Sequence, residues 1–165
     1  MNPSMATGTS PLAVPPGAGR HVWHIDNLMT FKAVAADTGG LLALWEQSLP
    51  VGSSPPLHVH HREDEAWYVL EGELTFRVAD DTHAAEAGSF LWAPRGLPHS
   101  FRVDSPTARL LGIAVPAGFE EFFLATGRPA ETPTIPPPPD GPPDMGALLA
   151  AAARHDTDLL GPPMS

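Results

Sequence analysis

Three histidines and one glutamate stand at spacings that could bring them to a single metal ion. His58 and His60 flank one residue in PLHVHH, and alternate residues of a β-strand point to the same face. Glu65 follows a short charged turn at the start of the next apolar run, where a hairpin can place its carboxylate opposite the two imidazoles. His99 begins a further strand after a Pro-Arg-Gly turn. We therefore predict one site formed by these four side chains.

The donor set indicates which ions such a site would hold. Three imidazole nitrogens and one carboxylate oxygen suit a divalent transition metal, either Fe, Mn, Ni, Co, Cu or Zn. The chain has no cysteine, so thiolate sites, disulfides and cysteine nucleophiles are excluded. Four protein ligands on a six-coordinate ion would leave two positions for a chelating substrate, or for a substrate and dioxygen.

The other histidines lack this support. A single histidine in a strand is commonly a surface residue or a hydrogen-bonded core residue, and a His-x-His pair alone is a weak signal for a metal. The prediction depends on four residues occurring together with their turn residues. We assign structural roles to the remaining five, which are His21, His24, His61, His83 and His155.

The two stretches that carry these residues resemble the two motifs of the cupin family. The first, G-x5-HxH-x4-E-x6-G, is matched by Gly52, His58, His60, Glu65 and Gly72. The second, G-x5-PxG-x2-H-x3-N, is matched by Gly88, Pro94, Gly96 and His99, with Val103 where the family often has asparagine. The resemblance implies a cupin β-barrel and the ligand set predicted above. Val103 should make the cavity more apolar without changing the ligands.

The remainder of the sequence favours the same fold class. From residue 21 to about residue 115, short apolar runs alternate with turn signals, which is typical of an antiparallel sandwich or barrel. We predict a mainly all-β protein, a cupin-type antiparallel β-barrel or jelly roll with short C-terminal helices. Residues 21–128 would form the barrel and a following helix, after a flexible N-terminal arm over residues 1–20. Residues 129–165 would form a proline-rich connector and a helix packing on the barrel.

Two helices are predicted near the C-terminus. Phe119, Phe122 and Phe123 fall at i, i+3 and i+4, which places three rings on one helix face that can pack on the barrel. Residues 145–155 form the second helix, with Asp144 as a plausible N-cap. These helices could cover the mouth of the barrel or form an interface between subunits.

Strand alternation also predicts the wall of a substrate pocket. Counting from Glu65 places Trp67 and Val69 inward, and counting from His99 places Phe101 and Val103 inward. Phe90 and Trp92 share one face of their strand, and we include them in the pocket although alternation does not determine which face points inward. Such a wall suits a flat apolar ligand. The alternative is that these side chains simply fill the barrel.

Outside the motifs, the chain resembles single-domain cupins described as similar to quercetin 2,3-dioxygenase. The residues that carry this looser match are Gly118-Phe-Glu-Glu-Phe-Phe123, Gly127 and Leu160-Gly-Pro-Pro163. The resemblance implies a dioxygenase in which Glu65 is both a metal ligand and the base that removes a substrate hydroxyl proton. The alternatives are a non-oxidative metal-dependent cyclase or isomerase, or a cupin that only binds a small molecule.

The charge composition limits the classes of partner that the chain could bind. The 165 residues include 19 acidic and 9 basic side chains, a net charge of −10, which argues against binding to nucleic acid or anionic membranes. Without a recognisable signal segment or a long apolar run, the expected location is cytoplasmic. The expected partners are a small aromatic substrate and, for a dioxygenase, dioxygen. A homodimer is also expected, because related cupins often form one.

Overall fold

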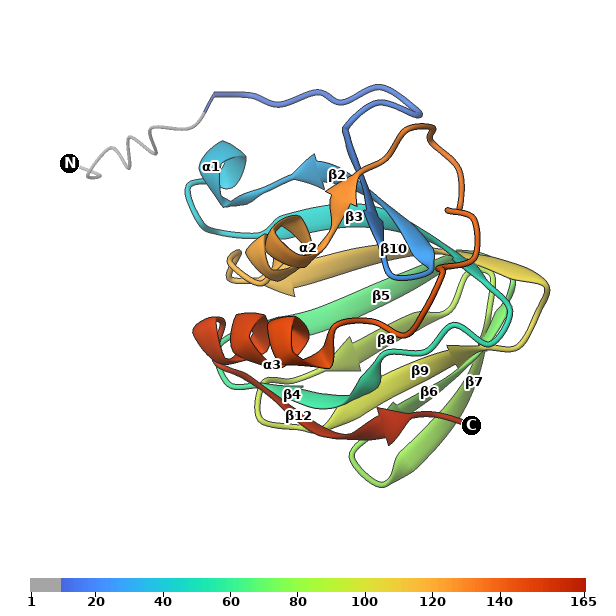
Figure 1. Ribbon diagram of the computed structural model, residues 1–165. Helices are drawn as coiled ribbons and strands as arrows, with labels where there is room; N and C mark the ends of the chain where they lie inside the picture. The colour runs from blue at the N-terminus through green and yellow to red at the C-terminus, as the bar shows by residue number, and fades with distance from the viewer. Residues whose placement is uncertain (1–9) are drawn as a thin grey trace.

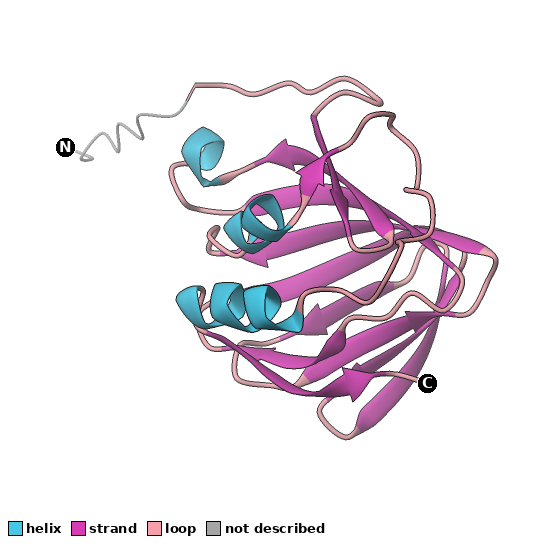
Figure 2. Cartoon of the chain, viewed as in Figure 1, coloured by secondary structure: helices cyan, strands magenta, loops and turns pink. Residues whose placement is uncertain are grey.

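Two antiparallel β-sheets face each other and enclose the interior of the protein (Figures 1 and 2). The computed structural model describes residues 10–165. The larger sheet has the order β11 (Arg128–Pro129), β1 (Arg20–His24), β2 (Asn27–Ala33), β3 (Ala43–Pro50), β10 (Thr107–Val115), β5 (Asp64–Glu71) and β8 (Phe90–Ala93). The smaller sheet has the order β12 (Thr157–Pro163), β4 (Pro56–His60), β9 (His99–Val103), β6 (Glu73–Val78) and β7 (Asp81–Glu86). The predicted cupin-type all-β fold is confirmed.

Alternation of apolar and polar residues determines which face of each strand lies inside. In β3, the sequence ALWEQSLP alternates between buried and partly exposed positions along its whole length. Trp45 is completely buried on this strand, and Gly112 of β10 is its register partner. A Cβ atom at Gly112 would lie 2.4 Å from the Trp45 indole, so only glycine leaves room for this ring.

Two apolar clusters fill the space between the sheets. One lies beneath the helices and includes Met29, Phe31, Trp45, Phe119 and Phe122. The other fills the opposite part of the barrel, and its largest members are Leu49, Trp67, Val69, Leu74, Phe76, Phe101, Val103 and Leu110. Both clusters combine side chains from distant parts of the chain, so burial of their apolar surface stabilises the pairing of the sheets.

Within the described residues, three helices accompany the sheets: α1 (Ala35–Thr38), α2 (Glu120–Thr126) and α3 (Met145–Arg154). Figure 1 shows α2 and α3 side by side over the opening between the two sheets. The predicted aromatic face of α2 is confirmed, since Phe119 and Phe122 are buried and Phe123 packs against the same cluster. The predicted N-cap of α3 is also confirmed, because the Asp144 side chain accepts a hydrogen bond from the Ala147 backbone N–H.

The C-terminal segment contributes more than the predicted connector and helix. Strand β12 follows α3 and pairs with β4, so the last part of the chain completes the smaller sheet next to the His-x-His strand. The sequence analysis did not predict this strand. The predicted N-terminal arm spans residues 1–20, and its residues 1–9 lie outside the described residues. Near its other end, the carbonyl of Ala18 accepts a hydrogen bond from the Lys32 side chain. Over residues 10–165, every helix is too short or too polar to cross a membrane.

Candidate metal centre

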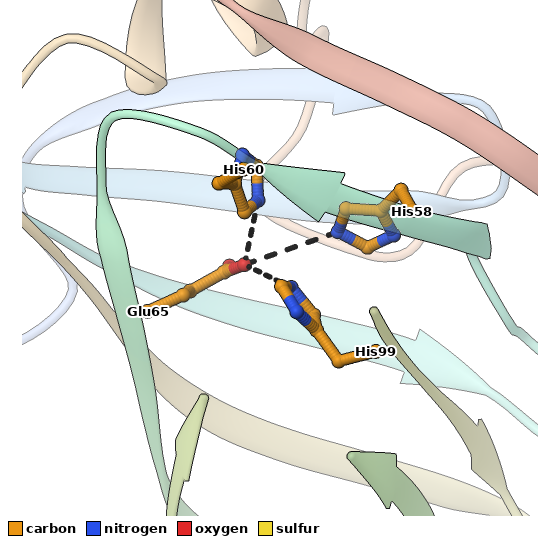
Figure 3. Close-up of side chains that lie close together, drawn as sticks. All are labelled: His58, His60, Glu65 and His99. Atoms are coloured by element: carbon orange, nitrogen blue, oxygen red, sulfur yellow. Dashed lines mark hydrogen bonds and ion pairs between the residues drawn. The ribbon is translucent and has the colours of Figure 1, made fainter. Parts of the chain in front are cut away.

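Four side chains from three strands converge between the two sheets (Figure 3). His58 and His60 come from β4, Glu65 from β5 and His99 from β9. All four are buried, with 8%, 1%, 5% and 1% of their surfaces exposed, respectively. One donor atom from each residue lies within 4.8 Å of the others. The structure therefore brings together the four side chains that the sequence analysis predicted as ligands.

Local backbone interactions hold the two motifs together. His58 and His99 are register partners across β4 and β9, which places their imidazoles side by side. The turn before His99 is tied to β4, because the backbone N–H of Gly96 donates to the carbonyl of His60 over 2.7 Å. Gly96 has a φ of +81°, a backbone conformation that favours glycine. The turn glycine of the second motif therefore helps to position a histidine of the first.

The distances from Glu65 to the histidine nitrogens are short enough for a shared metal ion. Nε2 of His60 and Nε2 of His99 lie 3.0 and 3.1 Å from Oε2 of Glu65, and Nε2 of His58 lies 4.0 Å from it. Two donors bound to one ion at about 2.1 Å can lie at most about 4.2 Å apart. The three distances from Glu65 fall within that limit, so Glu65 could share an ion with each histidine.

The second nitrogen of each imidazole is already engaged. Nδ1 of His58 lies 2.7 Å from the carbonyl oxygen of Pro56, and Nδ1 of His99 lies 2.9 Å from that of Leu97. A carbonyl oxygen only accepts, so both Nδ1 atoms carry the proton. Each Nε2 atom is then left with a lone pair directed at the cluster, as metal-ligating histidines require.

Thr157 of β12 holds the proton of the third histidine, His60, on its Nδ1 atom. Its hydroxyl lies 2.9 Å from Nδ1 of His60 and donates its own hydrogen to the carbonyl of His155. The hydroxyl oxygen therefore accepts the Nδ1 proton of His60. Thr157 is only 3% exposed, so no bulk water competes for this bond. The sequence analysis missed Thr157, which lies 97 residues from its partner.

These hydrogen bonds explain why the cluster suits a cation. With each proton on Nδ1, three Nε2 lone pairs face a carboxylate oxygen, and acceptors facing acceptors repel unless a cation or added protons lie between them. Burial lowers the pKa of His58, which disfavours the added proton there. Burial also acts to raise the pKa of Glu65, but hydrogen bonds from imidazoles that carry an added proton on Nε2 hold it well below its ordinary value. The cluster is able to bind a metal ion.

A small cavity of about 130 Å³ opens beside the cluster and is lined by His58. Phe101 lines it as predicted. Trp67, Val69 and Val103 do not line it, and they fill the barrel core, with the Trp67 ring 5.5 Å from that of His99. For these three residues, the alternative that small barrels fill their interiors with such side chains describes the structure better.

The prediction that Phe90 and Trp92 line the pocket is wrong. They are 59% and 45% exposed, so they lie on the outer face of β8, and Leu91 and Ala93 of the same strand face the core. Alternation correctly placed both aromatic rings on one face. It could not show which face points inward, because both sets of residues on this strand are apolar.

Except for Phe101, the cavity is lined by residues that the sequence analysis did not assign to the pocket. The lining includes His24, Asn27 and Gln47 from β1–β3, the rings of Phe119, Phe122 and Phe123, and Leu148 of α3. The helices therefore cover this cavity, one of the two roles considered for them. His24, to which we assigned a structural role, contacts Phe122 and Phe123 edge-on and has a pKa lowered to about 4 by burial.

A wider groove of about 810 Å³ elsewhere, lined by Trp23 and residues 136–139, includes none of the four cluster residues.

Comparison with known proteins supports the fold and the motifs. The cupin domain family model matches residues 45–115. Quercetin 2,3-dioxygenase of Bacillus subtilis (strain 168) is 31% identical over 124 residues, which cover 75% of this chain and 37% of that protein. Quercetin 2,3-dioxygenase of Aspergillus japonicus is 28% identical over 88 residues, which cover 48% of this chain and 25% of that protein. The chain thus spans well under half the length of these relatives.

Solved structures extend the similarity to the barrel as a whole. The structure of KdgF from Halomonas sp. superposes with a TM-score of 0.60 at 15% identity, covering 68% of this chain and 99% of that one. A predicted oxalate decarboxylase from Thermotoga maritima has a TM-score of 0.59 at 21% identity, covering 63% and 99%. At these identities the similarity concerns the fold alone. Residues 45–115 thus match the cupin domain family, within a chain that has a cupin-type fold and resembles quercetin 2,3-dioxygenases in sequence.

Proposed function

We propose that this protein is a metal-dependent dioxygenase that acts on a flat aromatic or enolic small molecule. The observation that carries the proposal is the buried cluster of His58, His60, Glu65 and His99, whose donor atoms all lie within 4.8 Å of one another. The two relatives named quercetin 2,3-dioxygenase supply the reaction class. The cavity beside His58, lined in part by four phenylalanines, supplies room for a ring.

In this proposal the four residues hold Fe, Mn, Ni, Co, Cu or Zn. When bound, such an ion would lower the energy of a substrate enolate and, for the redox-active metals, allow electron transfer to dioxygen. The remaining chemistry belongs to the protein. Each engaged Nδ1 keeps its imidazole in a fixed orientation, so the site requires little rearrangement on binding.

Glu65 would act as the base as well as a ligand. Its carboxylate is ionised at neutral pH, because the pKa of Glu65 lies well below the ordinary value despite burial, owing to the three neighbouring histidines. An enol hydroxyl that reaches the site next to His58 could transfer its proton to the free lone pair of a Glu65 oxygen. Phe101, Phe119 and Phe122 would exclude water from the substrate while this happens.

The test joins metal content to oxygen consumption. The purified full-length chain is analysed for metals, reconstituted with each candidate ion and assayed in an oxygen electrode with quercetin and with single-ring hydroxypyranones. Near-stoichiometric Fe, Mn, Co, Ni or Cu with substrate-dependent oxygen uptake supports the proposal. Stoichiometric metal without uptake on any compound favours the non-oxidative cyclase, isomerase or binding role. A protein that retains no metal after reconstitution overturns the proposal.

Matched variants separate the site from general effects of mutation. His58→Ala removes a ligand and should abolish both metal retention and oxygen uptake. His83→Ala removes an exposed histidine of β7 and should change neither. The homodimer expected from the sequence stays a prediction, which light scattering on the same preparation tests.

A further inference from the structure

The size of the cavity beside His58 limits the substrate of the proposed dioxygenase. Its volume is about 130 Å³. An apolar cavity of about 150 Å³ accommodates one benzene ring, and sites for drug-sized ligands usually measure about 300–1,000 Å³. The space therefore fits one six-membered ring and is too small for the three rings of a flavonol. This inference deepens the proposed function and depends on it.

One wall of the cavity is shaped for a flat ring. The rings of Phe119 and Phe122 are stacked, with centroids 5.2 Å apart and planes inclined by 9°. Phe123 packs edge-on against Phe119, which fixes this aromatic surface on α2. Planar rings pack favourably against such faces and edges.

The wall formed by the larger sheet carries polar groups without partners. Four buried side-chain polar atoms lack a hydrogen-bond partner within residues 10–165, and two of them, His24 Nε2 and Asn27 Oδ1, belong to residues that line this cavity. His24 and Asn27 are register partners across β1 and β2, and each is only 6% exposed. Gln47 of β3 adds an amide to the same wall. Since more than 90% of buried polar groups are paired, two unpaired neighbours in the wall of a cavity are suited to receive a polar group of a ligand.

The position of these groups defines the shape of that ligand. His58 belongs to the smaller sheet, whereas His24, Asn27 and Gln47 belong to the larger sheet that faces it. A ligand bound between the sheets would therefore meet the candidate metal ligand on one side and the polar groups on the other. One ring spans this gap if it carries chelating oxygens at one edge and a hydroxyl group at the opposite edge.

We propose that the substrate is a single-ring hydroxy-ketone or related chelating enol with a hydroxyl group across the ring, and that His24, supported by Asn27 and Gln47, binds this hydroxyl. His24 and its neighbours would thus determine specificity. The phenylalanine wall would accept the ring and exclude larger fused systems.

Three probes that share one chelating group test both parts of the proposal. Kojic acid and allomaltol are 5-hydroxy-4-pyranones that differ only at carbon 2, which bears hydroxymethyl in the first and methyl in the second. 3-Hydroxyflavone presents the same hydroxy-ketone on a three-ring skeleton. Binding is measured by calorimetry on the full-length protein loaded with Zn²⁺, which is redox-inert, so that no turnover interferes.

The expected order is kojic acid, then allomaltol, then 3-hydroxyflavone. A hydrogen bond to an otherwise unpaired buried group should favour kojic acid over allomaltol by roughly tenfold. His24→Leu should bring this ratio to about one without weakening allomaltol, and His24→Gln should restore part of it. Gln47→Leu, monitored in parallel, should lower the ratio less and provides a second variant if His24→Leu does not fold.

Each contrary outcome has a distinct meaning. If 3-hydroxyflavone binds as tightly as allomaltol, the single-ring limit is wrong. If kojic acid and allomaltol bind equally, or if the ratio survives in His24→Leu, the assignment of His24 is wrong. If zinc is retained but no probe binds, the whole inference is overturned while the metal site stands. If the wild-type protein retains neither zinc nor any other of the candidate ions, the proposed function fails and the inference fails with it.

Discussion

The hydroxyl of Thr157 offers the most direct test of how this chain prepares its candidate metal centre. Its oxygen accepts the Nδ1 proton of His60 over 2.9 Å and its hydrogen goes to the carbonyl of His155, so the tautomer of His60 depends on this residue. Thr157→Val keeps the shape of the side chain and removes the acceptor. The variant would leave a buried N–H group without a partner beside the cluster.

The expected loss of metal affinity follows from the missing hydrogen bond between Thr157 and His60. An unpaired buried donor costs about 1–3 kcal/mol, and removing a hydrogen-bond partner of a metal-ligating histidine weakens metal affinity by roughly 10–100-fold. At about 1.4 kcal/mol per tenfold change, the second range corresponds to about 1.4–2.8 kcal/mol, so the two estimates agree. His60 would escape the cost by rotating or by moving its proton to Nε2, and either change removes a lone pair from the cluster.

The assay is competition for Zn²⁺ between the protein and a chromophoric chelator at fixed pH. We expect Thr157→Val to raise the dissociation constant by roughly 10–100-fold. Thr157→Ser, which keeps the hydroxyl, should remain within about threefold of the wild type. A valine variant that binds zinc as tightly as the wild type, with unchanged thermal unfolding, would refute the claim that β12 prepares the site.

Three further predictions follow from single features of the structure. His99→Ala should lose stoichiometric metal by elemental analysis, whereas a metal content equal to that of the control His83→Ala would contradict the ligand assignment. His24 has a pKa of about 4 in the folded state against an ordinary 6.5, so the stability of its neutral form is present above pH 6.5 and is lost as the pH falls toward 4. Between pH 7 and pH 5 the wild type should lose about 2 kcal/mol more unfolding free energy than His24→Gln in urea titrations, and parallel curves would refute this. Gly112→Ala would press a methyl group against the Trp45 indole and should destabilise the protein by about 1–3 kcal/mol, measured in the same way, and an unchanged midpoint would show that the ring can move aside.

Much of the metal centre could be predicted from sequence because its determinants are local. The two histidines of β4 share a face because they are two residues apart on one strand, and alternation follows from backbone geometry alone. The turn glycines and prolines of the two motifs indicated where β5 and β9 begin. The aromatic face of α2 and the Asp144 cap of α3 were predictable for the same reason, since helix periodicity and capping involve residues at most four positions apart.

The tertiary structure decided what lies around these ligands. Alternation relates the side chains of one strand to one another, but only the packing of the sheets determines that Leu91 faces the core and that Phe90 and Trp92 face outward. The return of the chain to β4 after α3 places Thr157 against His60, a contact between residues 97 positions apart that no local pattern contains.

The sequence by itself therefore determined the fold class, the four side chains of the cluster and the two C-terminal helices, because backbone periodicity and turn chemistry act over a few residues. The tertiary structure alone decided which side chains line the cavity, how small that cavity is and which buried atoms of His24 and Asn27 lack partners. These properties arise where two sheets and two helices meet, and burial is a property of the assembled chain rather than of any segment.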